Sequence, residues 1–148
     1  MTDLERGASA PAATAQDSTG RRAAAVRRMV LCAVVIGVAL IDQLTKVWAL
    51  RALTPGTKVE LVGSVFGLQL VFNPGAALSM GNSATVVVTV LASVVVVVGA
   101  WWAWTVRSRG WLVTVGALLG GAIGNLIDRF LRAPAVGRGH VVDFLDYG

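Results

Sequence analysis

Three long apolar segments dominate the pattern of the chain. They cover residues 29–50, 84–106 and 111–131. Because an α-helix rises about 1.5 Å per residue, each segment is long enough to cross the roughly 30 Å hydrocarbon core of a bilayer. The second segment is rich in valine, but a segment surrounded by lipid must satisfy its backbone hydrogen bonds internally, which favours a helix over a strand. The pattern therefore predicts three transmembrane helices.

A shorter segment between the first two helices has the two-residue period of a β-strand. Apolar side chains occupy alternate positions at Phe66, Leu68, Leu70 and Phe72. Residues 59–61 alternate in the same way, and Gly63-Ser64 suits a turn between the two runs. We expect a small β element over residues 57–73, lying on the outer face of the membrane. An irregular linker is the alternative.

The N-terminal residues differ in composition from the rest. Residues 1–25 are rich in Ala, Ser, Thr and Arg and show no apolar period, which is typical of a disordered tail. A cleaved secretory signal is the rival interpretation, but no A-x-A site follows the first apolar segment. We expect a disordered cytoplasmic tail over residues 1–25 and one membrane domain over residues 26–148. The predicted fold class is an all-α polytopic membrane protein with a small extracytoplasmic β element.

Composition supports a membrane protein. Of the 148 residues, 55% are hydrophobic and 14% are charged, and the mean hydropathy is +0.71. Soluble domains contain about 25% charged residues, and a soluble fold of this size has too little interior to hide so much apolar surface. A soluble enzyme is therefore excluded. The net charge of +5 comes largely from arginines that cluster beside the apolar segments, which orients a protein in a bilayer, so no nucleic-acid partner is expected.

The positions of the arginines predict the orientation. Six flank the apolar segments on one side: Arg21, Arg22, Arg27, Arg28, Arg107 and Arg109. Since positively charged loops remain in the cytoplasm, the N-terminus is expected there, and residues 51–83 and those after 131 on the outer side. The tryptophans lie near the segment ends, as in an interfacial belt: Trp48, Trp101, Trp102, Trp104 and Trp111.

Ionisable residues inside apolar segments mark candidate functional positions, because each costs about 2.5–3.5 kcal/mol to place there. Asp42 and Lys46 are four residues apart, so they share a helix face and can neutralise each other; a purely structural pair is the alternative. Asn125, Asp128 and Arg129 fall close together near the outer end of the third segment. A structural ion pair is the alternative interpretation of the two charged residues.

Glycines at a spacing of four run along the third segment. They are Gly116, Gly120 and Gly124. Small residues at this spacing lie on one face of a helix and let another helix approach closely. We therefore expect the third helix to pack tightly against a neighbour.

Few other side chains offer chemistry. Cys32 is the only cysteine and His140 the only histidine, which excludes a disulfide and a cluster of Cys or His around a metal. Asp143 lies inside the apolar run 141–145, where its carboxylate is expected to be partly desolvated and suited to proton transfer. Asp146 comes three residues later and would approach Asp143 if this stretch were helical. Solvated loop acids are the alternative for both.

Four motifs, taken in order, resemble the signature boxes of a known family. They are Asp42-Gln43-Leu44-Thr45-Lys46, Asn73-Pro74-Gly75-Ala76-Ala77, Gly124-Asn125-Leu126-Ile127-Asp128-Arg129 and Val141-Val142-Asp143-Phe144. The family is lipoprotein signal peptidase, also called signal peptidase II, and the resemblance runs from about residue 29 to residue 148. It implies an aspartyl endopeptidase of the bacterial inner membrane that removes signal peptides from diacylglyceryl-modified prolipoproteins, cutting just before the lipidated cysteine.

The resemblance also implies roles for individual residues. Asp143 matches one of two catalytic aspartates. The positions that match the substrate site are Asn73, Asn125 and Arg129, and those that match supporting residues are Asp42, Lys46 and Asp128. The segment 57–73 matches the family's extracytoplasmic β-cradle, on the side of the active site. No metal or organic cofactor is implied, and the implied partners are prolipoprotein substrates and membrane lipid.

The sequence departs from the family at its C-terminal end. The family places its second catalytic aspartate in an F-N-x-A-D box at the start of a fourth membrane helix, and this sequence contains neither. The expectation is that the chain is either a fragment or a degenerate copy. Because a carboxylate dyad needs two acids that share a proton, we expect the chain alone to be inactive.

Two other classes of function remain open. One is a non-catalytic membrane protein that binds lipidated substrate or holds an assembly together, which the missing second aspartate favours. The other is a small transporter whose charged residues line an ion path. Transporters are commonly built from repeated halves, and no such repeat is visible in the sequence.

Overall fold

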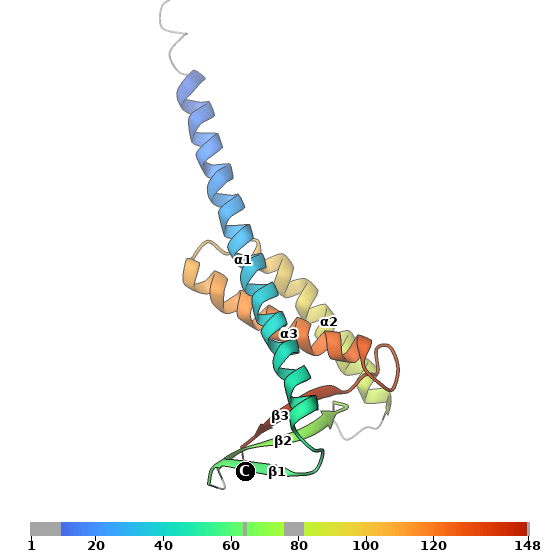
Figure 1. Cartoon of the computed structure of the whole chain (residues 1–148). Coiled ribbons are helices and arrows are strands. Elements are labelled where there is room, and N and C mark those ends of the chain that lie inside the picture. Colours follow the sequence, from blue (N-terminus) through green and yellow to red (C-terminus); the bar gives the residue numbers. More distant parts are fainter. Residues whose placement is uncertain (1–9, 64, 76–81, 148) are drawn as a thin grey trace, which may run out of the picture.

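The computed structural model describes residues 10–63, 65–75 and 82–147, with side chains from residue 18 in the first helix and from residue 85 in the second. Six elements follow in order: α1 (Ala10–Ala52), β1 (Lys58–Val62), β2 (Phe66–Asn73), α2 (Asn82–Ala103), α3 (Arg109–Leu131) and β3 (Val141–Asp146). The three strands form a sheet across one end of the helices, and α1 extends past the α2–α3 loop at the other end (Figure 1).

All three predicted apolar helices are confirmed. The parts long and apolar enough to cross a membrane are Ser18–Ala52 of α1, Thr85–Ala103 of α2 and Arg109–Leu131 of α3. The most apolar window of α3 is 33% buried, against 6% in α1 and 11% in α2, so α3 is the helix that packs against both others. Most apolar side chains of the other two face outward, as expected where the surroundings are lipid.

The first helix begins earlier than predicted. Residues 10–25, predicted to be a disordered tail, are helical and continue α1. Ala and Arg have high helix propensities, and the membrane segment that follows supplies a formed helix that these residues extend, so no new nucleation is needed. The prediction was therefore wrong for residues 10–25, while residues 1–9 lie outside the described part of the chain.

Small residues bring α3 against α1, which confirms the predicted close approach. The glycines that face α1 are Gly116, Gly120 and Gly124. A Cβ atom on Gly120 would lie 2.7 Å from Cβ of Val38 and 2.8 Å from the carbonyl oxygen of Val35, and one on Gly124 would collide with the carboxylate of Asp42. The backbone of α3 therefore contacts α1 directly, and this contact brings the polar residues of the two helices together.

The sheet confirms the predicted β element and adds a strand to it. β1 pairs with β2 and β2 with β3, both antiparallel. Gly63 follows β1 with a φ of 52°, a left-handed conformation that glycine adopts without strain. Ser64, the other residue of the predicted turn, lies outside the described residues. β3 was not predicted, because residues 141–146 do not alternate strictly and their partner strand is distant in sequence.

The strand conformation of β3 separates its two acids. Successive side chains of a strand point to opposite faces, so Asp143 and Asp146, three residues apart, face different ways. Val142 is 1% exposed and packs against Ala49 and Leu70, anchoring the sheet to the end of α1. Asp143 therefore points away from this core and is exposed. The predicted partial desolvation of its carboxylate was therefore wrong, and the approach of Asp146, expected only for a helical stretch, does not occur in this strand.

Candidate active site

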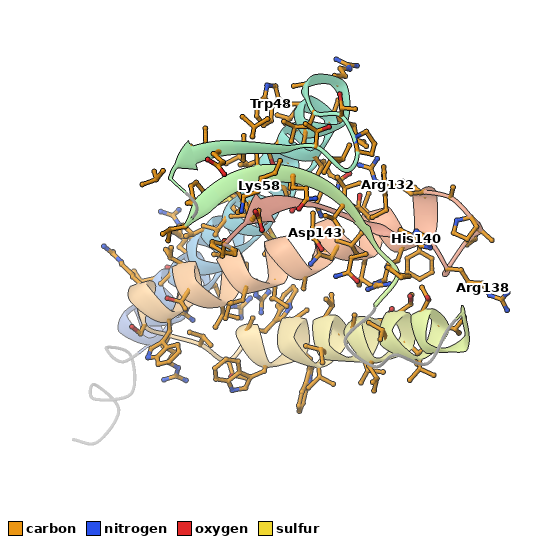
Figure 2. All side chains as sticks on the ribbon, turned by 90° about the horizontal axis from the view of Figure 1, so that it is seen from below. Trp48, Lys58, Arg132, Arg138, His140 and Asp143 are labelled. Carbon is orange, nitrogen blue, oxygen red and sulfur yellow. The ribbon has the colours of Figure 1, made fainter. Side chains whose placement is uncertain are left out.

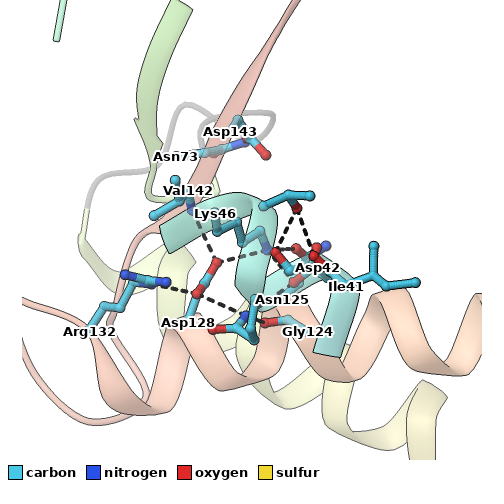
Figure 3. Close-up of polar contacts among 12 residues, drawn as sticks. Ile41, Asp42, Lys46, Asn73, Gly124, Asn125, Asp128, Arg132, Val142 and Asp143 are labelled. Atoms are coloured by element: carbon cyan, nitrogen blue, oxygen red, sulfur yellow. Dashed lines mark hydrogen bonds and ion pairs between the residues drawn. The ribbon is translucent and has the colours of Figure 1, made fainter. Parts of the chain in front are cut away.

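A buried group of charged and polar side chains lies where α1, α3 and β3 meet (Figure 3). Lys46 on α1 is 3% exposed. Its Nζ lies 2.9 Å from Oδ2 of Asp42, 2.8 Å from Oδ2 of Asp128 and 2.8 Å from Oδ1 of Asn125. An ammonium group has three hydrogens to donate, and each of them has an acceptor here. The predicted Asp42–Lys46 pair is confirmed, and it also ties α1 to α3.

Asp128 is the anion at the centre of this group and is completely buried. Besides the ammonium of Lys46, its carboxylate accepts hydrogen bonds from Nε of Arg132 at 2.5 Å and from the backbone N–H of Val142 at 3.2 Å. A buried carboxylate is destabilising unless it is paired and hydrogen-bonded, and these donors provide both. The bond to Val142 fixes the backbone of β3 directly before Asp143.

Two members of this group were not predicted. Arg132 lies four residues after Asp128, a spacing that places both on one helix face and that sequence inspection could have recognised. Gln43 donates from Nε2 to the carbonyl oxygen of Gly124 at 3.0 Å and to Oδ1 of Asp128 at 3.3 Å. Among the described residues, Asp128 forms its ion pairs with Lys46 and Arg132. Its neighbour in sequence, Arg129, points in a different direction on the helix.

Asp143 lies on β3 (Figure 2), and its side chain meets that of Asn73, the last residue of β2 (Figure 3). Nδ2 of Asn73 donates to Oδ2 of Asp143 at 3.1 Å. The other end of the same amide, Oδ1 of Asn73, accepts the backbone N–H of Gly75 at 2.8 Å. Gly75 has a φ of 97°, so the turn after β2 requires glycine at this position. The turn holds the amide in place, and the amide in turn orients the carboxylate.

Arg129 lies beneath this turn. Its side chain is 6% exposed, and a Cβ atom on Gly75 would be 3.6 Å from its Nη2. Asp143 attracts the guanidinium electrostatically. Among the described residues, the buried Nη1 of Arg129 has no hydrogen-bond partner. An unsatisfied buried donor is destabilising, so Arg129 has the capacity to bind an acceptor from another molecule.

The predicted site residues thus fall into two groups. Asn73, Arg129 and Asp143 surround the turn after β2, and the second group consists of Asp42, Lys46, Asn125 and Asp128 in the buried cluster. Ala76 and Ala77, from the second motif, lie outside the described residues. Within the described part of the chain, no three His, Cys, Asp or Glu side chains are grouped as metal ligands.

The chemistry available beside the turn is that of one carboxylate, one amide and one guanidinium. Such a set can remove a proton from water and hold a carbonyl or phosphate oxygen. Asp146 does not join it, since it pairs with Lys58 at 2.5 Å on the opposite face of β3. Among the residues that the structure describes, Asp143 is therefore the carboxylate available for proton transfer at this place.

Comparisons with known proteins identify one family. The sequence profile described as "Signal peptidase (SPase) II" matches residues 34–148. The chain is 46% identical to the "Lipoprotein signal peptidase" of Rhodococcus jostii (strain RHA1), over 82% of this chain and 62% of that protein. It is 42% identical to the protein of the same name from Mycolicibacterium smegmatis, over 100% of this chain and 63% of the relative. The chain thus spans about three fifths of the length of these relatives.

A solved structure shares the fold. It is a bacterial membrane enzyme determined by the in meso method at 1.9 Å resolution, with a TM-score of 0.66 and 22% sequence identity. The match covers 79% of this chain and 73% of that one. The arrangement of helices and sheet is therefore that of a known membrane enzyme.

Proposed function

The chain belongs to the signal peptidase II family, and from this premise we propose that it forms the catalytic domain, or part of it, of an aspartyl endopeptidase that processes bacterial prolipoproteins. The proposed substrate is a prolipoprotein already modified with diacylglyceryl, cut just before the lipidated cysteine. The observation that carries the proposal is the contact of Asn73 with Asp143 on a strand fixed by the buried cluster. An oriented carboxylate on a rigid support is what proton transfer to or from water requires.

Each group at the site has a proposed role. Asp143 takes a proton from the attacking water, and Asn73 keeps its carboxylate pointing toward that water. Arg129 offers its guanidinium, whose Nη1 has no hydrogen-bond partner among the described residues, to an oxygen of the substrate, either a peptide carbonyl or a lipid phosphate. Asn125 is proposed as a substrate-site residue from its motif, although its described partner is Lys46. Asp42, Lys46 and Asp128 support the site from below.

The reaction needs a second acid. In a carboxylate dyad one group accepts a proton from water while its partner, held neutral, donates to the scissile carbonyl oxygen. Asp146 faces away from Asp143, and Asp128 is buried between two cations, so neither is suited to the second role. We therefore propose that the 148-residue chain is inactive by itself. A non-catalytic protein that binds lipidated substrate is the second candidate, because Asp143 has no suitable acid partner among the described residues.

The proposed orientation follows from the distribution of charge. Arg107 and Arg109 lie in or beside the α2–α3 loop, at the end of the helices opposite the sheet (Figure 1). Positive loops favour the cytoplasm, so the N-terminus and this loop are proposed to be cytoplasmic. The sheet and Asp143 are then on the extracytoplasmic side of the bacterial inner membrane, where a prolipoprotein presents its lipidated cysteine.

The test is a chimera. The chain is joined to the segment of a family member that carries the F-N-x-A-D box and fourth helix, and this chimera is incubated with a diacylated prolipoprotein in detergent. The chimera should cleave, and Asp143→Asn should lower the rate at least about 10²-fold, since proton transfer supplies about that much. Asp146→Asn is the matched control on the same strand and should retain the rate within about twofold.

Three results would contradict the proposal. One is a chimera that folds and binds the prolipoprotein without cutting it, which would favour the binding protein. Another is equal loss of rate in the two aspartate variants, because that would show a general effect on the strand. A third is cleavage by the 148-residue chain alone that Asp143→Asn abolishes, which would refute the proposed inactivity.

A further inference from the structure

A second region of the molecule, remote from Asp143, has the features of a binding site. An apolar pocket of about 240 Å³ lies between the three helices toward the α2–α3 loop. Its lining includes Arg28, Leu31, Val35 and Ile36 of α1, Ala100 of α2 and Leu119 of α3. From Arg28 to Ile36 the wall runs about 12 Å along α1, so the pocket reaches from the edge of the apolar segment into it.

The positively charged side chain of Arg28 lies at the mouth of this pocket. The guanidinium carbon of Arg28 lies over the indole of Trp104, 4.9 Å from its centroid. A cation–π contact of this kind does not use up the five N–H donors of the guanidinium, which remain able to bind an acceptor. A smaller pocket, lined by both Arg27 and Arg28, adjoins the first. Among the described residues, no carboxylate forms an ion pair with Arg28.

Among the side chains that the structure describes, those with a charge near the pocket are positive. The carboxylates whose positions the structure describes are Asp42, Glu60, Asp128, Asp143 and Asp146. Asp17 and Asp42 are on the same helix as Arg28, at about 17 Å and about 21 Å from it along the axis. Both separations exceed the Debye length of about 8 Å in physiological salt, so these acids neutralise the arginines little. An anion brought to the mouth of the pocket is therefore attracted.

We propose that this pocket binds one anionic phospholipid of the surrounding membrane. The phosphate accepts hydrogen bonds from Arg28, with Arg27 beside it, and the first part of one acyl chain lies along Val35 and Ile36. A cation and an indole at the level of the headgroups, above an apolar wall, match the two halves of a phospholipid. A soluble anion would leave the apolar wall unused. The inference does not depend on peptidase activity.

Lipid binding can be measured by native mass spectrometry of the detergent-purified chain. Phosphatidylglycerol and phosphatidylcholine with identical acyl chains are titrated in parallel. We expect phosphatidylglycerol to bind about tenfold more tightly, because both lipids carry the phosphate but the ammonium of choline cancels the negative charge that attracts Arg27 and Arg28. Arg28→Gln should abolish this preference. Arg107→Gln is the matched control, because it removes a positive charge at the same end without lining the pocket, and it should keep the preference.

The position of the lipid has its own readout. Cys32 lines the pocket, is exposed, and is the only cysteine of the chain, so its rate of alkylation by N-ethylmaleimide reports occupancy. Phosphatidylglycerol should slow alkylation several-fold in the wild type and in Arg107→Gln, and have no effect in Arg28→Gln. This comparison remains decisive if a variant changes the general affinity for detergent or lipid.

Several results would overturn the proposal. Equal affinity for the two lipids would rule out a site that recognises the anionic headgroup. Equal loss of preference in Arg28→Gln and Arg107→Gln would show that the lipid is attracted by the overall positive charge of this end and not bound at a specific site. Protection of Cys32 by glycerophosphoglycerol, which has the headgroup but no acyl chains, would show that the wall is not used. Protection that follows dimer formation without added lipid would assign the pocket to a second copy of the chain.

Discussion

The clearest quantitative consequence of the buried cluster concerns the change Lys46→Met. Methionine keeps the length of the side chain and removes the ammonium that contacts three oxygen-bearing residues at 2.8–2.9 Å. Asp128 is fully buried and would keep Arg132 as its remaining ion-pair partner. Breaking a buried ion pair by removing one partner costs about 3–5 kcal/mol. Since about 1 kcal/mol moves Tm by about 2–4 °C at this size, we expect Tm to fall by about 10 °C.

Thermal unfolding in detergent, followed by tryptophan fluorescence, measures this effect. Lys58→Met is the matched control, because Lys58 also pairs with an aspartate, but the two side chains are 31% and 23% exposed. Exposed pairs contribute about 0.2–1 kcal/mol, so the control should lower Tm by no more than about 4 °C. Equal changes in the two variants would refute the claim that burial makes the Lys46 pair the stronger one.

Two other changes test the helix contact and the arginine at the turn. Gly120→Ala should destabilise the chain by about 1–3 kcal/mol, because the new Cβ would meet Val38 at 2.7 Å. Gly121→Ala on the same helix is the control: its Cβ would meet nothing within 4 Å, so it should be neutral or slightly stabilising. Thermal unfolding measures the stability of both variants, and equal losses would contradict the proposed contact. Arg129→Lys in the chimera keeps the charge and loses the planar fork, so cleavage should fall about tenfold, and a native rate would rule out a directional role for the guanidinium.

Hydropathy was sufficient to predict the three helices, because crossing lipid imposes length and apolar composition on each helix separately. The start of α1 was missed for the opposite reason, since residues 10–25 are polar enough to look disordered while having high helix propensity. The β1–β2 hairpin shows in the local alternation of residues. β3 does not, because its place is decided by pairing with β2 over a long sequence separation. Local patterns carry no information on such pairing.

The candidate site, too, was predictable from local patterns only in part. The Asp42–Lys46 pair and the glycine face were predictable, since both follow from helical periodicity. That Lys46 also reaches Asp128 depends on how α1 and α3 pack, which no spacing within one helix reveals. The exposure of Asp143 depends on the face of β3 that it occupies, and a one-residue shift of register would have buried it.

The proposed role of Asp143 in lipoprotein signal peptide cleavage is tested by the mass of the product that the chimera releases from a diacylated prolipoprotein. We expect a mature product whose first residue is the diacylglyceryl-modified cysteine, no product from Asp143→Asn, and none from a precursor whose cysteine lacks the lipid. A product cut at another position, or the same product from Asp143→Asn, would show that Asp143 does not have this role.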